Sequence, residues 1–158
     1  MGAGLATGAT TVSKRYTWIN HETSLATGKL VAASSIEAGT IPENAVGGEV
    51  RLEKPWRAAP IPQWLQVDLQ GAFQIGKVAV ILFWDGRRYY QYTVEVSTDG
   101  KTWTQVVDMS KNTAPGTDKG FTREFKPTPG RHLKVNMLKN SSNPGAHLVE
   151  LQVYETRK

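Results

Sequence analysis

The segment WDGRRYYQY, residues 84–92, brings together side chains that could bind a polar ligand. Its two arginines carry planar guanidinium groups that donate hydrogen bonds in a fixed geometry. Its three tyrosines each combine an apolar ring with a hydroxyl group. In a strand these rings would pack into a core, whereas in a loop they could contact a ligand.

The alternating pattern of the residues after this segment indicates which of its side chains are buried. Tyr90 and Tyr92 share the alternation of Val94 and Val96, so both rings are predicted to face the core of a strand. The side chains that remain for the loop are those of Arg87, Arg88 and Tyr89. Binding chemistry is therefore expected in the loop that precedes the strand.

Signatures of common enzyme classes are missing from the sequence. It holds no Gly-x-Ser-x-Gly elbow, no His-Glu-x-x-His motif and no phosphate-binding Gly-x-x-x-x-Gly-Lys loop. The histidines, His21, His132 and His147, lack the spacing of a metal site. The carboxylates of Glu22, Glu43, Glu49 and Glu53 lie in polar stretches with no sign of a raised pKa. The sequence predicts no catalytic residue.

Composition excludes several other kinds of site. The 158 residues include no cysteine, which rules out disulfides, thiolate metal sites and thiol catalysis. The longest apolar run, Val78–Trp84, is far too short to span a membrane. The formal net charge is +5, but the lysines and arginines are scattered along the chain. A nucleic-acid partner is therefore not expected.

Short apolar runs separated by Gly, Pro, Asn and Asp are typical of an antiparallel β protein. In WLQVDL, residues 64–69, the side chains of Leu65, Val67 and Leu69 fall on one face. The run KVAVILFW, residues 77–84, is apolar on both faces. This second pattern predicts a central strand that is covered on two sides.

A hairpin is predicted within YTVEVSTDGKTWTQVV, residues 92–107. Asp99-Gly100 lies between its alternating runs and indicates a tight turn in which both central residues have positive φ. Two further strands are expected in HLKVNML and LVELQVY, and no helical periodicity persists beyond a turn or two. The pattern predicts an all-β sandwich whose strands are joined by long loops.

Several segments together resemble one known family. AASSIEAGTIPENAV, PQWLQVDLQGAFQIGKVAV, YTVEVSTDGKTWTQV, RHLKVNML and HLVELQVYE, in this order over Val31–Glu155, are similar to the discoidin or coagulation factor five/eight type C family. The lack of cysteine resembles its bacterial branch, which includes the family 32 carbohydrate-binding modules. The resemblance implies a galactose-binding-like jelly-roll β-sandwich of about eight strands. One domain is expected over residues 11–158, with residues 1–10 as a flexible linker or cloning remnant.

The resemblance also implies a lectin-like module that binds a saccharide through loops at one end of the sandwich. An aromatic ring can cover the apolar C–H face of a sugar, while guanidinium and amide groups address its hydroxyls. Three segments are expected to meet there, KPWRAAP (54–60), WDGRRYY (84–90) and KNSSNPGAH (139–147). The expected ligand-binding residues are Trp56, Arg57, Asp85, Arg87, Arg88, Tyr89, Asn140, Asn143 and His147.

The tryptophans differ in what the resemblance implies for them. Trp64 and Trp103 match the fold pattern and are expected to be structural. Trp84 ends the central strand and could serve either role. Trp56 is the sharpest candidate for contact with a sugar, and its alternative interpretation is packing against the sandwich.

Members of the family often hold a structural calcium ion with an Asp-Gly turn, backbone carbonyls and a glutamate near the C-terminus. Glu150 matches that glutamate, but Gly47 stands where the aspartate is expected. Calcium takes about six to eight oxygen ligands, preferably with carboxylate charge. Glu49 could supply the missing acid. Calcium held by Glu150 and Glu49 is the one cofactor that the resemblance suggests, and its absence is the stronger expectation.

The family resemblance implies a noncatalytic module of a larger secreted protein, located outside the cell, in the periplasm or at the cell surface. Its expected partner is a glycan or polysaccharide. The leading alternative is an adhesion domain that binds protein or anionic phospholipid. Membrane insertion is not expected, because the loops offer mainly Trp56 among basic and small residues. Single-stranded nucleic acid would need a continuous basic groove.

Overall fold

The structure, a computed structural model, describes residues 23–156 of the chain. The expected linker at residues 1–10 and the expected start of the domain at residue 11 lie outside this range. The described residues form seven strands and one short helix, η2, and no helix among them is long and apolar enough to cross a membrane. The elements are β1 (Leu30–Ala33), η2 (Pro42–Val46), β2 (Trp56–Ala58), β3 (Gln63–Leu82), β4 (Tyr90–Ser97), β5 (Thr104–Met109), β6 (Phe121–Asn140) and β7 (Ala146–Glu155).

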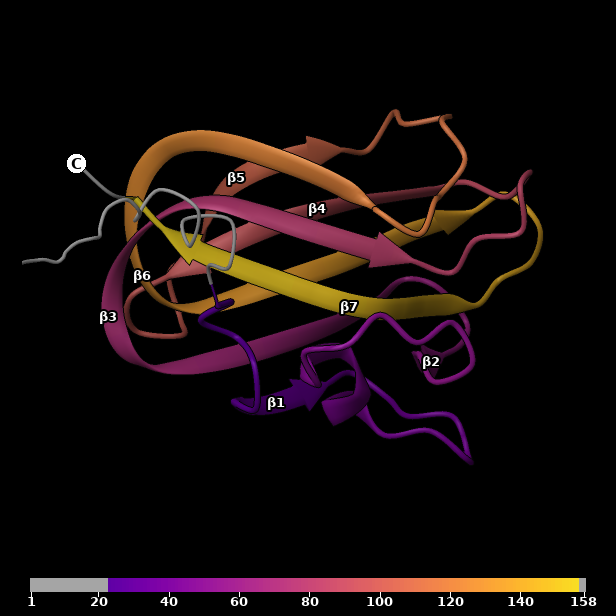
Figure 1. Cartoon of the computed structure of the whole chain (residues 1–158), viewed down its shortest axis with the longest axis horizontal. Coiled ribbons are helices and arrows are strands. Elements are labelled where there is room, and N and C mark those ends of the chain that lie inside the picture. Colours follow the sequence, from indigo (N-terminus) through magenta and orange to yellow (C-terminus); the bar gives the residue numbers. More distant parts are fainter. Residues whose placement is uncertain (1–22, 157–158) are drawn as a thin grey trace, which may run out of the picture.

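Two strands of 20 residues each, β3 and β6, bend so that they belong to both layers of a sandwich. The first part of β3 pairs with β1 and with the end of β6, and its last part pairs with the start of β6 and with β7. One layer therefore runs β1-β3-β6-β4-β5 and the other β2-β7-β3-β6, with antiparallel pairing throughout. Figure 1 shows both long strands curving around the same end of the molecule. The predicted all-β sandwich is confirmed, with seven strands because two are shared between the layers.

The bend in β3 and β6 requires irregular backbone. The register of the two strands shifts between Asp68 and Phe73, where Gln70 has a φ of 63°. Such an irregularity lets a strand turn sharply and continue in another layer. On β6, a side chain at Gly130 would collide with Cγ1 of Val96, so only glycine fits there. These residues fix the closed end of the sandwich and leave the opposite end to the connections.

The predicted burial patterns along β3 are confirmed. The inward side chains of WLQVDL are at most 1% exposed and belong to the main core. The run KVAVILFW contributes to two clusters, because its alternate residues face opposite sides of the layer. The outer cluster consists of Ala79, Ile81 and Val149 with the partly buried Trp84 packed against it. Trp84 thus packs on the outer face of the layer.

The strand β4 begins at Tyr90 and buries the side chains that the alternation predicts. Tyr90 is 1% exposed and Tyr92 is 0% exposed. The arginines that precede Tyr90 lie in the β3–β4 connection. The division between core tyrosines and loop arginines is therefore confirmed.

The β4–β5 hairpin turns at the predicted place, but the prediction of a tight turn is wrong. The strands are joined by the six residues 98–103, and of the two central residues only Gly100 has positive φ, at 78°. Asp99 instead accepts hydrogen bonds with Oδ1 from the amides of Lys101 and Thr102, at 2.8 and 2.9 Å. The aspartate side chain organises a wider loop, which removes the need for two residues with positive φ.

Candidate functional site

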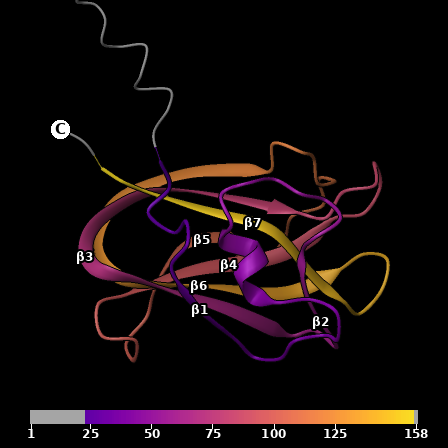
Figure 2. The same cartoon turned by 60° about the horizontal axis from the view of Figure 1, so that its bottom comes forward.

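Several connections meet at the end of the sandwich that lies away from the bends of β3 and β6, among them the β5–β6 connection, whose Gly116 N donates to Arg88 O at 3.2 Å (Figures 1 and 2). The β3–β4 and β6–β7 connections join because Ser141 N donates to Tyr89 O at 3.0 Å and Tyr89 N donates to Ser141 Oγ at 2.9 Å. The connection after β2 joins them through Ile61 N, which donates to Pro144 O at 2.8 Å. We refer to this end as the loop end, formed by residues 59–62, 83–89 and 141–145 with the adjoining ends of the strands.

His147, near the start of β7, lies at the centre of the loop end. Its Nδ1 is 2.6 Å from the hydroxyl of Tyr90, and its ring centroid is 5.8 Å from that of Phe83. Burial first, and then the nearby charge of Arg88, lowers the pKa of His147 to about 4. The imidazole is therefore neutral near pH 7 and presents one donor and one acceptor nitrogen.

The β6–β7 connection is shaped by its own amide side chains. Asn140 is 8% exposed, and its Nδ2 donates to Gly145 O and to Asn143 Oδ1, both at 2.9 Å. Its Oδ1 accepts from Ser142 N at 2.8 Å. A Cβ at position 145 would lie 2.9 Å from Cε1 of His147, so glycine allows the connection to approach the imidazole. Asn140 and Asn143 thus hold the connection in place, and Asn140 offers little surface to a ligand.

Arg88 lies beside His147 and is mostly covered. Its side chain is 16% exposed, and its guanidinium carbon lies 4.8 Å from the centroid of the Phe83 ring. Asp85 forms the turn below it, because its Oδ1 accepts from the amides of Arg87 and Arg88 at 3.0 and 2.8 Å. These backbone hydrogen bonds lower the pKa of Asp85 and keep it ionised. Asp85 therefore positions the arginines and has one oxygen left for other contacts.

Arg57 and four further side chains form the rim of the loop end. Nε of Arg57 lies 3.1 Å from Oε2 of Glu37, and both side chains are partly exposed. Tyr89 is partly buried, and Nζ of the exposed Lys139 lies 5.9 Å from its ring centroid. Arg87 is exposed. The rim thus offers guanidinium groups and one accessible aromatic ring to a ligand.

Trp56 is not part of this surface. It is 0% exposed, pairs with Leu148 of β7, and donates from Nε1 to Ser35 O at 3.0 Å. The three residues of β2 alternate, so Trp56 and Ala58 face the core while Arg57 faces outward. The interpretation of Trp56 as a ligand-contacting ring is therefore wrong, and its alternative as a packed core residue describes the structure.

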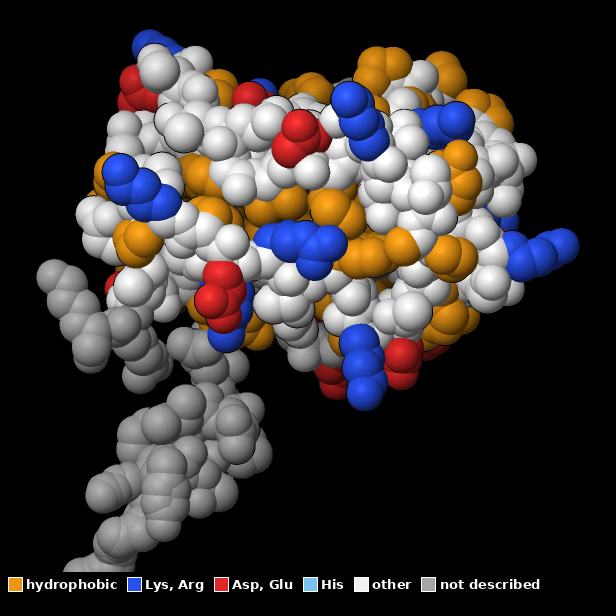
Figure 3. Space-filling view, turned by 90° about the horizontal axis from the view of Figure 1, so that it is seen from above, with side chains coloured by type: hydrophobic (Ala, Val, Ile, Leu, Met, Phe, Trp, Pro, Cys, Tyr) orange, Lys and Arg blue, Asp and Glu red, His pale blue; other side chains and the backbone are white. Residues whose placement is uncertain are grey.

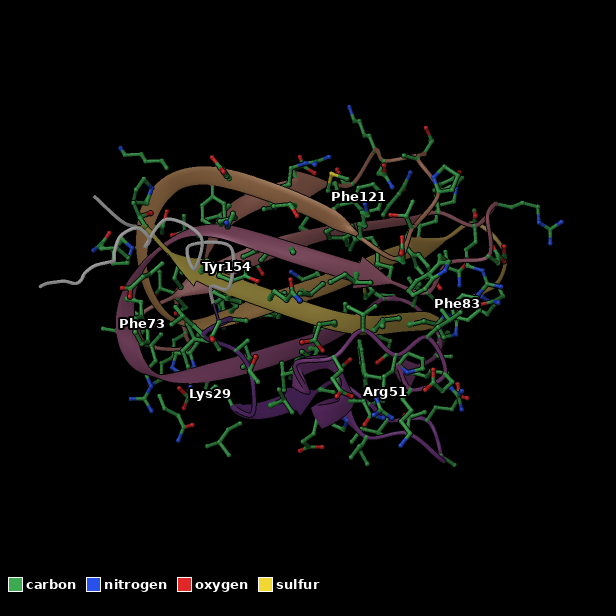
Figure 4. The ribbon with its side chains drawn as sticks, viewed as in Figure 1. Lys29, Arg51, Phe73, Phe83, Phe121 and Tyr154 are labelled. Atoms are coloured by element: carbon green, nitrogen blue, oxygen red, sulfur yellow. The ribbon has the colours of Figure 1, made fainter. Side chains whose placement is uncertain are left out.

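Two residues of the site were not predicted from the sequence. Phe83, labelled in Figure 4, lies under Arg88 and beside His147 among nitrogen-bearing side chains. Its position in an apolar run gave it the pattern of a core residue. Glu37 lies in a long polar stretch, and only the fold brings it to Arg57. Tyr90 was predicted as core, and its hydroxyl nevertheless reaches the site.

The two expected calcium ligands differ in their surroundings, since Glu150 is buried with Oε1 lacking a hydrogen-bond partner whereas Glu49 lies at the surface. Glu150 is 0% exposed, and its Oε2 accepts from Gly48 N at 2.9 Å. The turn that contains Gly48 would have to supply oxygen ligands to a calcium ion, but it directs an amide N–H at the carboxylate of Glu150. Glu49 is 65% exposed in its side chain and pairs with Arg51. The described residues contain no cluster of three or more acids or histidines that could hold a metal.

The loop end is an open surface. A hollow of about 290 Å³ lies beside η2 and shares only Arg57 with the residues above. It is lined by Gly39, Thr40, Ile41, Asn44, Glu53, Lys54, Pro55 and Arg57. Figure 3 shows a basic side chain projecting from the right-hand end of the molecule, which is the loop end in that view. A ligand would therefore be held from one side.

Comparison with protein-family models matches residues 30–151 to the F5/8 type C domain. A comparison with curated protein sequences gives no match.

Solved structures with a similar fold include modules and multidomain enzymes. A family 89 glycoside hydrolase from Clostridium perfringens, in complex with its substrate GlcNAc-α-1,4-galactose, matches 87% of this chain at a TM-score of 0.74 and 18% identity. The chain spans 15% of that enzyme. The family 32 carbohydrate-binding module of AlyQ, in complex with 4,5-unsaturated mannuronic acid, has a TM-score of 0.67 and 22% identity over 80% of this chain and 95% of its own. A chitosan-binding module from a Paenibacillus chitosanase/glucanase has a TM-score of 0.68 and 27% identity over 85% and 99%.

Proposed function

The chain belongs to the F5/8 type C domain family, and we propose that it is a noncatalytic carbohydrate-binding module whose ligand surface is the loop end. Structural relatives support this proposal, since one is in complex with a mannuronic acid derivative and another is a chitosan-binding module. The proposed ligand is a saccharide that lies against the rim and contacts His147.

The observation that carries the proposal is the convergence of Arg57, Arg88 and His147 from three separate segments. Both guanidinium groups are oriented by acids, and the imidazole is oriented by the hydroxyl of Tyr90. Planar donors held in fixed positions suit the hydroxyl groups of a sugar ring. Tyr89 is the ring that could cover an apolar C–H face, the role for which Trp56 is too deeply buried.

The noncatalytic part of the proposal rests on how the acids at this end are used. Oδ1 of Asp85 accepts two backbone amides, and the pKa of Asp85 is lowered rather than raised. Glu37 forms an ion pair with Arg57. A glycosidase needs a pair of carboxyl groups free to face the scissile bond. The acids of the loop end instead orient arginines.

We further propose that the chain functions as one module of a larger, secreted, carbohydrate-active bacterial protein. The chain spans 15% of the glycoside hydrolase that it resembles. A shallow surface of this kind binds weakly, because one sugar ring buries on the order of 100 Å² of apolar area, worth about 2.5 kcal/mol. A monovalent dissociation constant in the millimolar to high micromolar range is expected, so attachment to a larger protein would raise retention on a polymer.

A glycan array tests the proposal, followed by titration of the best ligand against the parent chain and the Arg88→Ala and Arg57→Ala variants. The proposal predicts retention of at least one glycan and a loss of affinity of at least about tenfold in each variant. Lys126→Ala is the control, since Lys126 is exposed near the bends of the long strands. Retention on anionic liposomes without any glycan binding, or variants that bind like the parent, would reject the proposal.

A further inference from the structure

The charges of the loop end are unbalanced. Among the rim and the β3–β4 and β6–β7 connections, the acids are Glu37 and Asp85, and each lies beside one arginine. The cations of the same segments are Arg57, Arg87, Arg88 and Lys139, and the β5–β6 connection, which also reaches this end, adds Lys111, Asp118 and Lys119. The surplus of positive charge matches the sign of the chain's formal net charge of +5. A ligand at this end therefore meets more hydrogen-bond donors with positive charge than the protein can itself neutralise.

Arg88 is incompletely satisfied by the protein. Its Nε is buried and has no hydrogen-bond partner, and the closest acidic oxygen, Oδ2 of Asp85, is 3.4 Å away. The other oxygen of Asp85 is held by two backbone amides. The Phe83 ring covers one side of the guanidinium and provides no acceptor in its plane. The guanidinium also interacts with the hydroxyl of Tyr90, so it is held in position by Phe83, Asp85 and Tyr90 together, with its charge only partly balanced.

Two further cations at this end form no close ion pair among the described residues. Arg87 is exposed at the tip of the β3–β4 connection, where its backbone amide donates to Asp85 and its charge acts on Asp85 without a close ion pair. Lys139 is exposed, and its described contact is with the ring of Tyr89. Both side chains can therefore reach a ligand without first breaking an ion pair.

The imidazole at the centre of the site is exposed to this positive field. Arg88 and Arg57 both disfavour a charge on His147, while Glu37 opposes them. Burial is the larger cause of the lowered pKa, and the arginines act in the same direction. The same field that disfavours imidazolium favours an anion placed next to the ring.

We propose that the loop end recognises an acidic glycan whose sugar rings carry carboxylate groups, that is, a chain containing uronic acid. This inference rests on the proposed function and names the ligand class of the same site. A guanidinium binds a carboxylate through two parallel hydrogen bonds, which gives both strength and orientation. Arg87 or Arg57 would contact the carboxylate at the rim, and Arg88 with His147 would address the hydroxyls of the same or the next ring.

The experiment compares an acidic oligosaccharide with its methyl ester, a matched pair that differs in carboxylate charge, and adds one cationic and one further acidic probe. Oligogalacturonate, its methyl-esterified form and chitosan oligosaccharide are titrated calorimetrically against the full chain at low and high salt, with oligomannuronate as a second acidic probe. The acidic probes should bind at least about tenfold more tightly than the methyl ester at low salt, and this ratio should fall at high salt. The cationic chitosan should be the weakest ligand.

Matched variants locate the effect. Arg87→Gln should lower the ratio of acidic to methyl-ester affinity, whereas Lys126→Gln, which removes one positive charge near the bends, should leave it unchanged. Equal or tighter binding of the methyl ester or of chitosan would overturn this inference and leave the proposed function in place. Absence of binding to every probe would overturn this inference, and an empty glycan array would in addition reject the proposed function. If Arg87→Gln and Lys126→Gln lowered the affinity ratio equally, the attraction would depend on overall charge and not on the loop end. That result would also overturn this inference.

Discussion

The hydroxyl of Tyr90 lies 2.6 Å from Nδ1 of His147, and this contact joins the core of the sandwich to its open end. Tyr90 is 1% exposed, so its ring is held by the core while its hydroxyl reaches the imidazole. The orientation of His147 is thereby fixed before any ligand arrives. A preorganised side chain loses less conformational entropy on binding than a mobile one.

Removing this hydroxyl should destabilise the protein. Tyr90→Phe leaves Nδ1 of His147 without its partner, at an expected cost of about 1–2 kcal/mol in the free energy of unfolding. Tyr92→Phe is the matched control on the same strand, because the hydroxyl of Tyr92 is buried without a hydrogen-bond partner. That change should be neutral or stabilising. Denaturant unfolding of both variants measures the difference, and an equal cost for the two would show that the contact contributes nothing.

The pH dependence of stability should contain two opposing contributions. The pKa of His147 falls from 6.5 to about 4 on folding, so its contribution is fully present above pH 6.5 and is lost as the pH falls towards 4. Burial raises the pKa of Glu150 from 4.5 to about 7, so its contribution is fully present below pH 4.5 and is lost as the pH rises through 7. The two partly cancel in the parent chain between pH 4.5 and 6.5.

Single variants separate these contributions. As the pH falls from 6.5 to 4.5, the free energy of unfolding of His147→Gln should rise relative to that of the parent. That of Glu150→Gln should fall relative to the parent over the same range. Denaturant unfolding at several pH values gives both differences. A difference that stays constant with pH would contradict the assignment for that residue.

Trp56 and Arg57 are adjacent on β2 and should respond in opposite ways to truncation. Trp56→Ala removes a fully buried ring and should cost about 3–5 kcal/mol of stability. Arg57→Ala removes an outward side chain in a partly exposed ion pair, so its stability should change by about 1 kcal/mol or less. Its glycan affinity should nevertheless fall. Thermal melting and glycan titration of the two variants test these predictions. A Trp56→Ala variant that melted like the parent would show that Trp56 is not a structural residue.

Calcium should have little effect on stability. A calcium ion present at about a hundred times its dissociation constant would stabilise the fold by about 2.7 kcal/mol, or roughly 5–11 °C in melting temperature. The single buried carboxylate of Glu150 receives an amide donor from Gly48, so a chelator should shift the melting temperature by much less. Magnesium serves as the control ion. A large drop with chelator that calcium alone restores would contradict the prediction.

Local patterns in the sequence were sufficient for most of the fold. Alternation identified the buried faces of β3 and β4, and an apolar run on both faces identified the layer covered on two sides. The bends of β3 and β6 left no comparable signal, because Gln70 and Gly130 become special only through their partners in other strands. The wide β4–β5 loop differed from the predicted turn because the side chain of Asp99 supplies acceptors that a propensity rule does not count.

The site was harder to predict than the fold, since its residues are brought together by distant pairings. The three segments that the family resemblance implied do meet in the structure. Trp56 was misassigned because its segment was taken for a loop, whereas it forms a short strand whose burial depends on pairing with β7 at Leu148. Glu37 was missed because its partner, Arg57, is remote in sequence. Phe83 was missed because the chain folds Arg88 back over its ring.

The central claim, that the loop end binds a glycan, is tested most directly by an NMR titration of the labelled chain with the best glycan from the array. Backbone amide shifts should move for residues 85–89 and 141–147 and for Arg57. The amides of residues 98–103, in the β4–β5 loop, should stay fixed, because this loop adjoins the bends at the opposite end. Shifts confined to the β4–β5 loop or to the outer faces of the sheets, with none at residues 85–89, would contradict the account.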